Sequence, residues 1–252
     1  MSYDHFGWAP YVSVKQRRID AEREIARLRK SGQAIAPVII EGRKIATTFW
    51  GKAWCDNLES YHDFAYRLPR GRSYARNRAV MDLQITPRCV KALVLGASTY
   101  TVGIDIAPAS KAQWLSICID CAGGIDSLIE LLRGQFSTGV MERICRQDEG
   151  LFPRPSEIKF TCDCPDYADM CKHVAAVLYG VGARLDAHPE LLFQLRAVDE
   201  NDLLTHVGRV APSPTTGDAT AKRLESEDLS ALFDLEMADD DASPPGPAGP
   251  RT

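Results

Sequence analysis

The sequence lacks the features of a membrane-spanning or secreted protein. No uninterrupted apolar run in its 252 residues approaches the roughly 18–20 that a transmembrane helix needs. Residues 1–10 do not combine a basic segment with an apolar core, so we expect no signal peptide. Eight cysteines without such a signal favour a reducing compartment. We therefore expect a cytoplasmic protein that contacts no membrane.

Common enzyme signatures are absent as well. The chain has no Gly-rich phosphate loop followed by Lys-Ser/Thr, no Gly-x-Ser-x-Gly and no His-Glu-x-x-His. No two carboxylates lie in settings that would tune one as an acid and the other as a base. The sequence names no catalytic residue, and we expect that the protein is not an enzyme.

Charge is divided unevenly along the chain, whose formal net charge is -4. Residues 212–252 carry nine acidic and three basic side chains, which leaves the rest of the chain mildly basic at +2. The acidic balance therefore does not argue against a nucleic-acid partner. Residues 211–252 are rich in Pro, Ser, Thr, Asp and Gly, and we predict a disordered tail there.

One apolar cluster interrupts this tail at residues 226–237. Leu229, Leu232 and Phe233 have helical spacing and follow acidic residues that suit a helix start. The pattern predicts a short helix that binds a partner's groove. A cluster without any partner would have the same pattern, so both interpretations stay open.

Four residues spell Cys-x-Cys-x6-Cys-x-His and predict a metal site: Cys162, Cys164, Cys171 and His173. Thiolate sulfur and neutral imidazole suit Zn²⁺ in a tetrahedron. Three sulfurs and one nitrogen close the coordination shell, so the predicted ion is a single structural zinc. Four unrelated buried residues are the alternative, but four ligands within twelve positions make it unattractive.

The residues around the ligands fit the same interpretation. Ile158, Phe160 and Cys162 alternate with polar residues as in a strand, and the apolar residues after His173 recur at helical spacing. The pattern resembles the SWIM zinc finger. Further segments resemble bacterial SWIM proteins of this length: FGWAPYVSV at 6–14, IATTFWGKAWCDNLESY at 45–61, LPRGRSYARN at 68–77 and CKHVAAVLYGVGARLD at 171–186. The resemblance covers roughly residues 1–205 and implies a role in binding DNA or proteins, beside a helicase-like ATPase of the remodeller superfamily.

A basic segment precedes the predicted sheet. Turn-forming Pro69 and Gly71 predict a loop, and its basic and aromatic residues suit phosphates and bases. A solvated loop, or one that anchors acidic groups of the same protein, is the equal alternative. Helix 11–31 is also basic and offers a weaker candidate surface. The predicted nucleic-acid contacts are Arg67, Arg70, Arg72, Tyr74, Arg76, Arg78 and Lys172.

The remaining pattern predicts an α+β fold, with an antiparallel meander, flanking helices and the small zinc-stapled strand-turn-helix. Strands are expected at 80–86, 90–97 and 100–107, a hairpin at 38–50, and helices at 51–60, 110–121, 125–132, 137–146 and 188–198. Trp50 and Trp54 share one helical face and are expected in the core. Cys118 and Cys121 are also expected in the core, and a second metal or redox site is the weaker alternative.

We divide the chain into an N-terminal domain at 1–150, the finger at 151–195, a connection at 196–210 and the tail at 211–252. The expected function is a zinc-binding, non-enzymatic module that binds nucleic acid, DNA rather than RNA, and acts with a helicase-like ATPase. A protein-only adaptor that docks the ATPase without touching nucleic acid is the alternative.

Overall fold

The computed structural model describes residues 12–61, 64–122 and 136–205. The described residues all belong to one compact unit. The predictions for helix 125–132 and for Leu229, Leu232 and Phe233 fall outside the described residues. Within them, helices surround one antiparallel sheet, which confirms the predicted α+β class. None of the helices in these ranges combines the length and the apolar character needed to cross a membrane.

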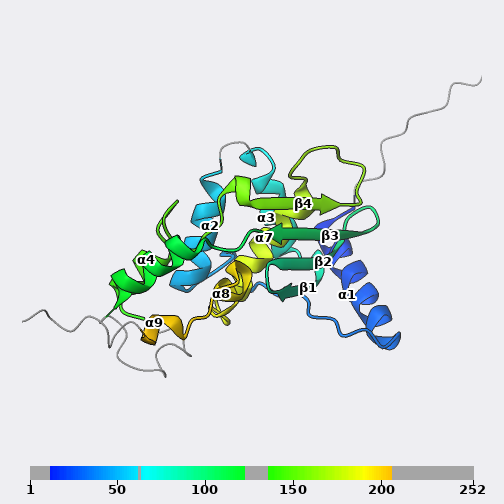
Figure 1. Ribbon diagram of the computed structural model, residues 1–252. Helices are drawn as coiled ribbons and strands as arrows, with labels where there is room; N and C mark the ends of the chain where they lie inside the picture. Colours follow the sequence, from blue (N-terminus) through cyan, green and yellow to red (C-terminus); the bar gives the residue numbers. More distant parts are fainter. Residues whose placement is uncertain (1–11, 62–63, 123–135, 206–252) are drawn as a thin grey trace, which may run out of the picture. The chain divides into compact units, whose positions relative to one another are not determined.

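Four strands form a single sheet in the order β1-β2-β3-β4 (Figure 1). They are β1 (Val80–Thr86), β2 (Cys89–Leu95), β3 (Thr99–Ile106) and β4 (Ile158–Cys162). The first three confirm the predicted meander, because alternating apolar residues place one face of each strand in the core. β4 comes from much further along the chain and pairs antiparallel with β3, from Val102↔Cys162 to Ile106↔Ile158. The strand that carries the first metal ligand thus belongs to the same sheet as the meander.

Helix α7 (Lys172–Leu185) is the centre of the core. Eleven of its 14 residues are buried, as expected for a helix that is largely apolar all round. It packs against the sheet and against helices α2 (Phe49–Glu59) and α3 (Leu68–Arg76) (Figure 1). Because this helix begins between the last two metal ligands, the position of the ligand segment, residues 162–173 (the knuckle), is coupled to the packing of the whole core.

Two contacts hold the helices against α7. Gly71 of α3 meets α7 so closely that a Cβ atom there would lie 2.4 Å from the Cβ of Ala175. The indole Nε1 of Trp54 donates to the carbonyl of Leu178 at 2.9 Å. Trp50 and Trp54 are only 4% and 3% exposed, which confirms their predicted place in the core.

The predicted hairpin at residues 38–50 is wrong. Val38 donates its backbone N–H to Val80, and Leu83 donates to Ala36, so this segment lies along the edge of β1. The second half of the expected hairpin instead begins helix α2, with Thr48 at its N-cap. A short apolar run such as residues 38–40 also suits an extended segment that borders a sheet, and this explains the error.

The predicted loop at residues 67–78 is also wrong, because most of it forms helix α3. Pro69 lies in the first turn of α3, where a backbone N–H has no acceptor within the helix. The proline therefore costs no helical hydrogen bond. Gly71 is required for close approach to α7 rather than for a turn. The same two residues therefore have a different physical role from the one that we predicted.

The basic helix predicted at residues 11–31 is observed as α1 (Val14–Lys30), with only Ala21 and Leu28 buried. Its Arg18 donates to the carbonyl of Arg76 at 3.2 Å, and Glu22 pairs with Arg78 at 3.1 Å. The helix is thus docked by a narrow edge and leaves much of its basic face exposed.

Short helices make up the rest of the described core: α4 (Lys111–Cys121), α6 (Thr138–Ile144), α8 (Leu191–Arg196) and α9 (Asp202–Thr205). Cys118 and Cys121 lie on the buried side of α4, each 1% exposed. Burial raises the pKa of the Cys118 thiol to about 12 and that of Cys121 to about 11. Both cysteines therefore belong to the core, as predicted.

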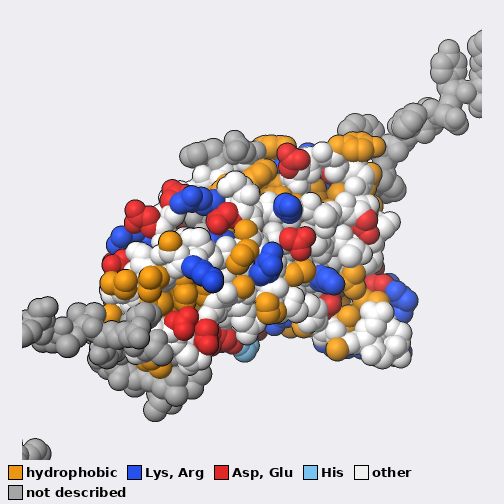
Figure 2. All heavy atoms as spheres, in the orientation of Figure 1, with side chains coloured by type: hydrophobic (Ala, Val, Ile, Leu, Met, Phe, Trp, Pro, Cys, Tyr) orange, Lys and Arg blue, Asp and Glu red, His pale blue; other side chains and the backbone are white. Residues whose placement is uncertain are grey.

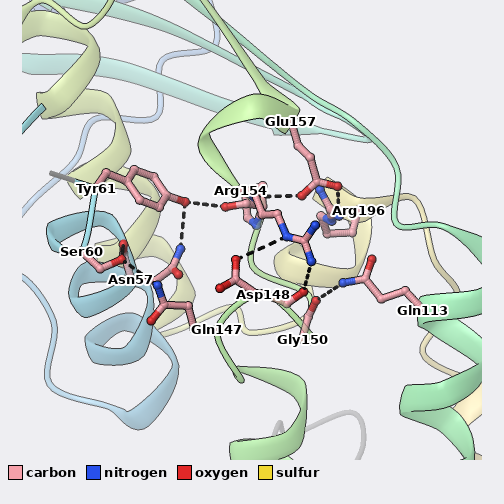
Figure 3. Close-up of polar contacts among 11 residues, drawn as sticks. Asn57, Ser60, Tyr61, Gln113, Gln147, Asp148, Gly150, Arg154, Glu157 and Arg196 are labelled. Carbon is pink, nitrogen blue, oxygen red and sulfur yellow. Dashed lines mark hydrogen bonds and ion pairs between the residues drawn. The ribbon is translucent and has the colours of Figure 1, made fainter. Parts of the chain in front are cut away.

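A polar network fixes the segment that leads into β4 (Figure 3). Arg154 pairs with Asp148 at 3.3 Å, and Tyr61 donates its hydroxyl to the carbonyl of Pro153. Glu157 pairs at 2.9 Å with Arg196, a side chain without any exposed surface. The segment just before β4 is therefore anchored by ion pairs, and the last residue of β4 is the candidate metal ligand Cys162.

Candidate metal centre

The four predicted ligands converge on one point. The potential ligand atoms of Cys162, Cys164, Cys171 and His173 all lie within 4.8 Å of one another. His173 Nδ1 lies 3.9 Å from the sulfur of Cys162 and 3.8 Å from that of Cys171. Edges of this length suit a tetrahedron whose centre is roughly 2.0–2.3 Å from each donor. No other group of three or more such ligands occurs among residues 12–61, 64–122 and 136–205.

Cys171 has two roles, because it is also the N-cap of α7. Its sulfur accepts a hydrogen bond from the backbone N–H of Val174 at 3.5 Å. The positive end of the helix macrodipole and this N–H both favour a thiolate over a neutral thiol. The helix start thus offsets part of the negative charge that three thiolates bring together.

The ring of His173 is held by two aromatic neighbours. The ring centroid of Tyr100 lies 4.5 Å from that of His173, and the two ring planes are tilted by 32°. Tyr74 makes an edge contact with His173 at a centroid distance of 5.6 Å. Since Nδ1 faces the sulfurs, Nε2 must carry the proton in the neutral tautomer. This buried Nε2 finds no acceptor among the described residues. Packing against the two tyrosine rings, rather than a hydrogen bond from Nε2, therefore orients the His173 ligand.

Gly96, in the turn between β2 and β3, allows this arrangement. A Cβ atom there would lie 2.8 Å from His173 Nε2 and 2.7 Å from the ring of Tyr100. Real Cβ contacts are longer, so any larger residue would displace one of the two rings. The turn of the meander and the metal ligand are therefore in direct contact.

The segment that carries the ligands, residues 162–173, is tied down at two acidic residues, one on each side of the second ligand. Asp163 accepts the backbone N–H of Thr101 at 2.9 Å, which continues the pairing of β4 with β3. Asp166 receives Arg67 on both carboxylate oxygens, at 3.0 and 2.9 Å. In contrast, Tyr167 at the tip of the loop is fully exposed. The loop is thus fixed beside its ligands and open at its tip.

Burial tunes the protonation of the ligands. It raises the pKa of the thiols of Cys162 and Cys171 and lowers the pKa of His173 to about 4. His173 is therefore neutral near pH 7 and has a lone pair for a metal. The thiols must release protons when a cation binds, so metal affinity depends on pH. Donor set, spacing and burial suit one structural zinc ion.

The residues predicted to contact nucleic acid do not form one patch. Arg67 is occupied by Asp166, and Arg72 pairs with Glu59 while lying 5.4 Å from the ring centroid of Tyr179. These two arginines join α3 to the metal loop, to α2 and to α7. They match the alternative that the sequence left open, in which arginines anchor acidic groups of the same protein.

The other predicted contacts differ in whether their side chains already interact with other groups of the protein. Arg78 pairs with Glu22, and Arg76 makes a 3.5 Å contact with the carbonyl of Arg43. Arg70 is exposed and has no ion pair among the described residues. Lys172 lies between two ligands and has its Nζ 5.9 Å from the ring centroid of Tyr74.

A cavity of about 760 Å³ adjoins the metal centre and is lined in part by residues outside the predicted contact set, of which Arg17 belongs to the basic helix that the sequence offered as a weaker candidate surface. Arg17 of α1 contributes to its wall and lies 5.9 Å from the ring centroid of Tyr74. Tyr100 and Gly96 reach it from the β2–β3 hairpin. No sequence signal joins these positions, because they meet only through the packing of α1 and the hairpin around α7.

Comparison with known proteins supports the assignment of the metal site. Residues 154–181 match the model of the SWIM zinc finger. The chain is also 34% identical over 166 residues to the uncharacterized protein Rv2102 of Mycobacterium tuberculosis, an alignment that covers 65% of this chain. The chain spans about 60% of the length of that relative. No solved structure matches the chain significantly.

The family match and the geometry concern the same residues. All four convergent ligands lie within residues 154–181, and the order strand, ligand loop, helix is observed as β4, loop and α7. The protein therefore contains a zinc-binding module of the SWIM zinc-finger type.

Proposed function

We propose that this zinc-stapled module binds nucleic acid, with DNA favoured over RNA, and that it catalyses no reaction. One observation carries the proposal. Arg17 and Lys172, from different helices, both approach the ring of Tyr74 beside the metal centre. Neither forms an ion pair within the described residues, so both charges are available to a ligand.

The position of these cations suits a phosphate backbone. Lys172 is fixed at its Cα because its neighbours Cys171 and His173 are both ligands. Arginine pairs with phosphate through two parallel hydrogen bonds, and lysine acts as a point charge. The negative charge of the two acidic residues in the same cavity is partly neutralised. Asp166 pairs with Arg67, and the Oδ1 atom of Asp20 lies 3.8 Å from a guanidinium nitrogen of Arg23.

The face of the sheet turned away from α7 offers no comparable surface. Figure 2 shows basic and acidic side chains interspersed over the face presented in this view. Lys91 on β2 and Lys159 on β4 are exposed, and Asp105 on the intervening strand β3 lies opposite Lys159. Mixed charge of this kind is typical of a solvated surface and does not favour a polyanion.

The test is a titration of the zinc-loaded full chain with a labelled DNA single strand, the matching duplex and the RNA of the same sequence. The double variant Arg17→Ala/Lys172→Ala removes the two cations beside the ring of Tyr74. Lys91→Ala/Lys159→Ala is the matched control, because it removes the same charge from the sheet face. Affinity is measured over a series of salt concentrations, since each phosphate contact lowers log K by about 0.7–0.9 per unit of log salt.

We expect saturable binding whose salt slope falls by about 1.4–1.8 in the Arg17/Lys172 variant, the equivalent of two lost phosphate contacts. The control variant should keep the slope of the wild type. Failure to bind any of the three ligands at low salt would refute the proposal. An equal fall of the salt slope in both double variants would show that only net charge matters and would refute the assigned surface.

The adaptor function is the second candidate, and one observation favours it. Leu115 and Ile119 are one helical turn apart on α4 and remain 48% and 53% exposed. Such a pair suits contact with another protein, for which the resemblance to SWIM proteins suggests a helicase-like ATPase. If no nucleic acid binds, Leu115→Ser/Ile119→Ser should weaken capture of that ATPase by the immobilised chain, and unchanged capture would count against this surface.

A further inference from the structure

The cavity beside the metal centre has the size and the walls of a ligand site. Its volume of about 760 Å³ lies within the range of about 300–1,000 Å³ that is usual for such pockets. Its walls come from four places: the first turns of α1, Tyr74 of α3, the β2–β3 hairpin and the metal loop with the start of α7. The metal fixes one of these walls, because Cys164 and His173 both line the cavity.

Two tyrosines give the cavity an aromatic lining. Tyr74 and Tyr100 contact the buried ring of His173 from different elements, and both remain only half-buried. Neither phenol hydroxyl hydrogen-bonds to another described residue. Aromatic faces with polar edges suit a flat, polar ring, because stacking tolerates any base and each hydroxyl can donate or accept one hydrogen bond.

The charges lie where a phosphate would accompany such a ring. Arg17 and Lys172 are close enough to the Tyr74 ring to contact a phosphate while a base rests on the aromatic wall. Leu95 and Pro165 add apolar surface to the same cavity. A ligand that is flat, polar and anionic is a nucleotide rather than an acidic peptide, because the carboxylates of a peptide carry no flat ring system.

We infer that this cavity receives one unstacked nucleobase, so that the preferred ligand is a single strand or an unpaired end rather than an intact duplex. This inference rests on the proposed nucleic-acid function and assigns its site. A base inside a duplex is already stacked and paired, and its extraction costs free energy that a single strand does not require. The phosphates beside that base contact Arg17 and Lys172.

The experiment uses the zinc-loaded full chain and a DNA single strand that carries one 2-aminopurine, whose fluorescence falls when it stacks on an aromatic ring. Binding is compared between this strand and its blunt-ended duplex. Tyr74→Leu and Tyr100→Leu remove the aromatic faces and retain apolar bulk. Tyr66→Leu is the matched control, because Tyr66 is 66% exposed and does not line the cavity. Zinc content and thermal midpoint are measured for each variant, since both tyrosines support His173.

We expect the single strand to bind about tenfold or more tightly than the duplex, with quenched 2-aminopurine fluorescence in the wild type. Each cavity variant should lose about tenfold in affinity and the quench, at unchanged salt slope, whereas Tyr66→Leu should lose neither. Equal binding of the duplex without quenching would overturn this inference and leave the proposed function standing. Absence of binding to either form would overturn the proposed function itself. A variant that loses zinc is set aside, and the quench in the wild type then decides.

Discussion

Two regions of this protein contain cysteines at close spacing, and they are held together by different physics. In the knuckle, residues 162–173, three sulfurs and an imidazole converge within 4.8 Å and the loop tip is exposed. In α4, Cys118 and Cys121 lie in the apolar core, and no third ligand joins them among the described residues. Cysteines are metal ligands in the first region and buried core side chains in the second.

The difference teaches that closely spaced cysteines take their role from the elements that carry them. Cys118 and Cys121 lie on one helix, so their sulfurs share a face that packs against other apolar side chains. The knuckle ligands come from a strand end, a loop and a helix start, which surround a point instead of lining a face. A metal is therefore expected to hold the first region, and apolar burial with ion pairs the second.

The largest effect is expected from Cys171→Ser, which removes a thiolate ligand while the serine hydroxyl can still cap α7. Zinc binding contributes about 10–16 kcal/mol in isolated finger peptides, comparable to the whole stability of a typical domain, about 5–15 kcal/mol. The variant should lose zinc, and its thermal midpoint should fall and become insensitive to chelator. The measurements are metal content and thermal unfolding with and without chelator.

Cys89→Ser is the matched control, because Cys89 is a half-buried cysteine on β2 outside the cluster. It should keep one zinc per chain and the chelator-sensitive midpoint of the wild type. If Cys171→Ser also retained zinc and an unchanged midpoint, the structural role of the metal would be wrong.

The next effect concerns an ion pair outside both cysteine regions. Glu157→Gln leaves the fully buried guanidinium of Arg196 without its anionic partner, and breaking a buried pair in this way costs about 3–5 kcal/mol. Denaturant unfolding at pH 7 measures this cost. Glu149→Gln is the control, because its pair with Arg146 is exposed and is worth about 0–1 kcal/mol.

The same pair gives a pH dependence. Burial of Glu157 opposes its charged form, but the hydrogen bonds from Arg196 and from the Arg154 backbone outweigh it, so its pKa is lowered. A lowered folded-state pKa means that the pair stabilises the fold above about pH 4.3, the ordinary value. This stability is lost as the pH falls through the lower folded-state pKa. The difference between wild type and Glu157→Gln should therefore shrink below about pH 4, and a difference that grew there would contradict the assignment.

A smaller effect is expected where the meander meets the knuckle. Gly96→Ala forces a Cβ atom against His173 and Tyr100, and such overpacking costs about 1–3 kcal/mol. The measurements are unfolding free energy and zinc affinity, both of which should fall. Gly139→Ala is the control of opposite sign, since it lies in α6 with no atom within 4 Å of the new Cβ. It should be neutral or stabilise by up to about 1 kcal/mol.

Thiol labelling sharpens the comparison without changing stability. The burial that raises the pKa of Cys118 and Cys121 to about 12 and 11 should keep both unlabelled in the native protein. Chelator should expose the three knuckle cysteines to the reagent while those two stay protected. Mass mapping of labelled peptides distinguishes the sets. Early labelling of Cys118 would instead support the alternative of a reactive thiol pair in α4.

Sequence reasoning succeeded where the signal was local. The ligand set, β4, α7 and the three meander strands follow from spacing and periodicity within short segments. It failed at residues 38–50 and 67–78, where a short apolar run, or a proline and a glycine two residues apart, fits more than one structure. There the choice was made by distant partners, β1 in the first case and α7 in the second.

The sequence by itself determined that four residues bind a metal, because the ligands of a closed zinc shell are encoded within twelve consecutive positions. Only the tertiary structure decided which cations remain free. Arg67 and Arg72 are taken by acidic residues from other segments, whereas Arg17 and Lys172 meet at one aromatic ring. The physical reason is that a coordination motif is a short-range property of the chain. The availability of a charge depends instead on every group that folding brings near it.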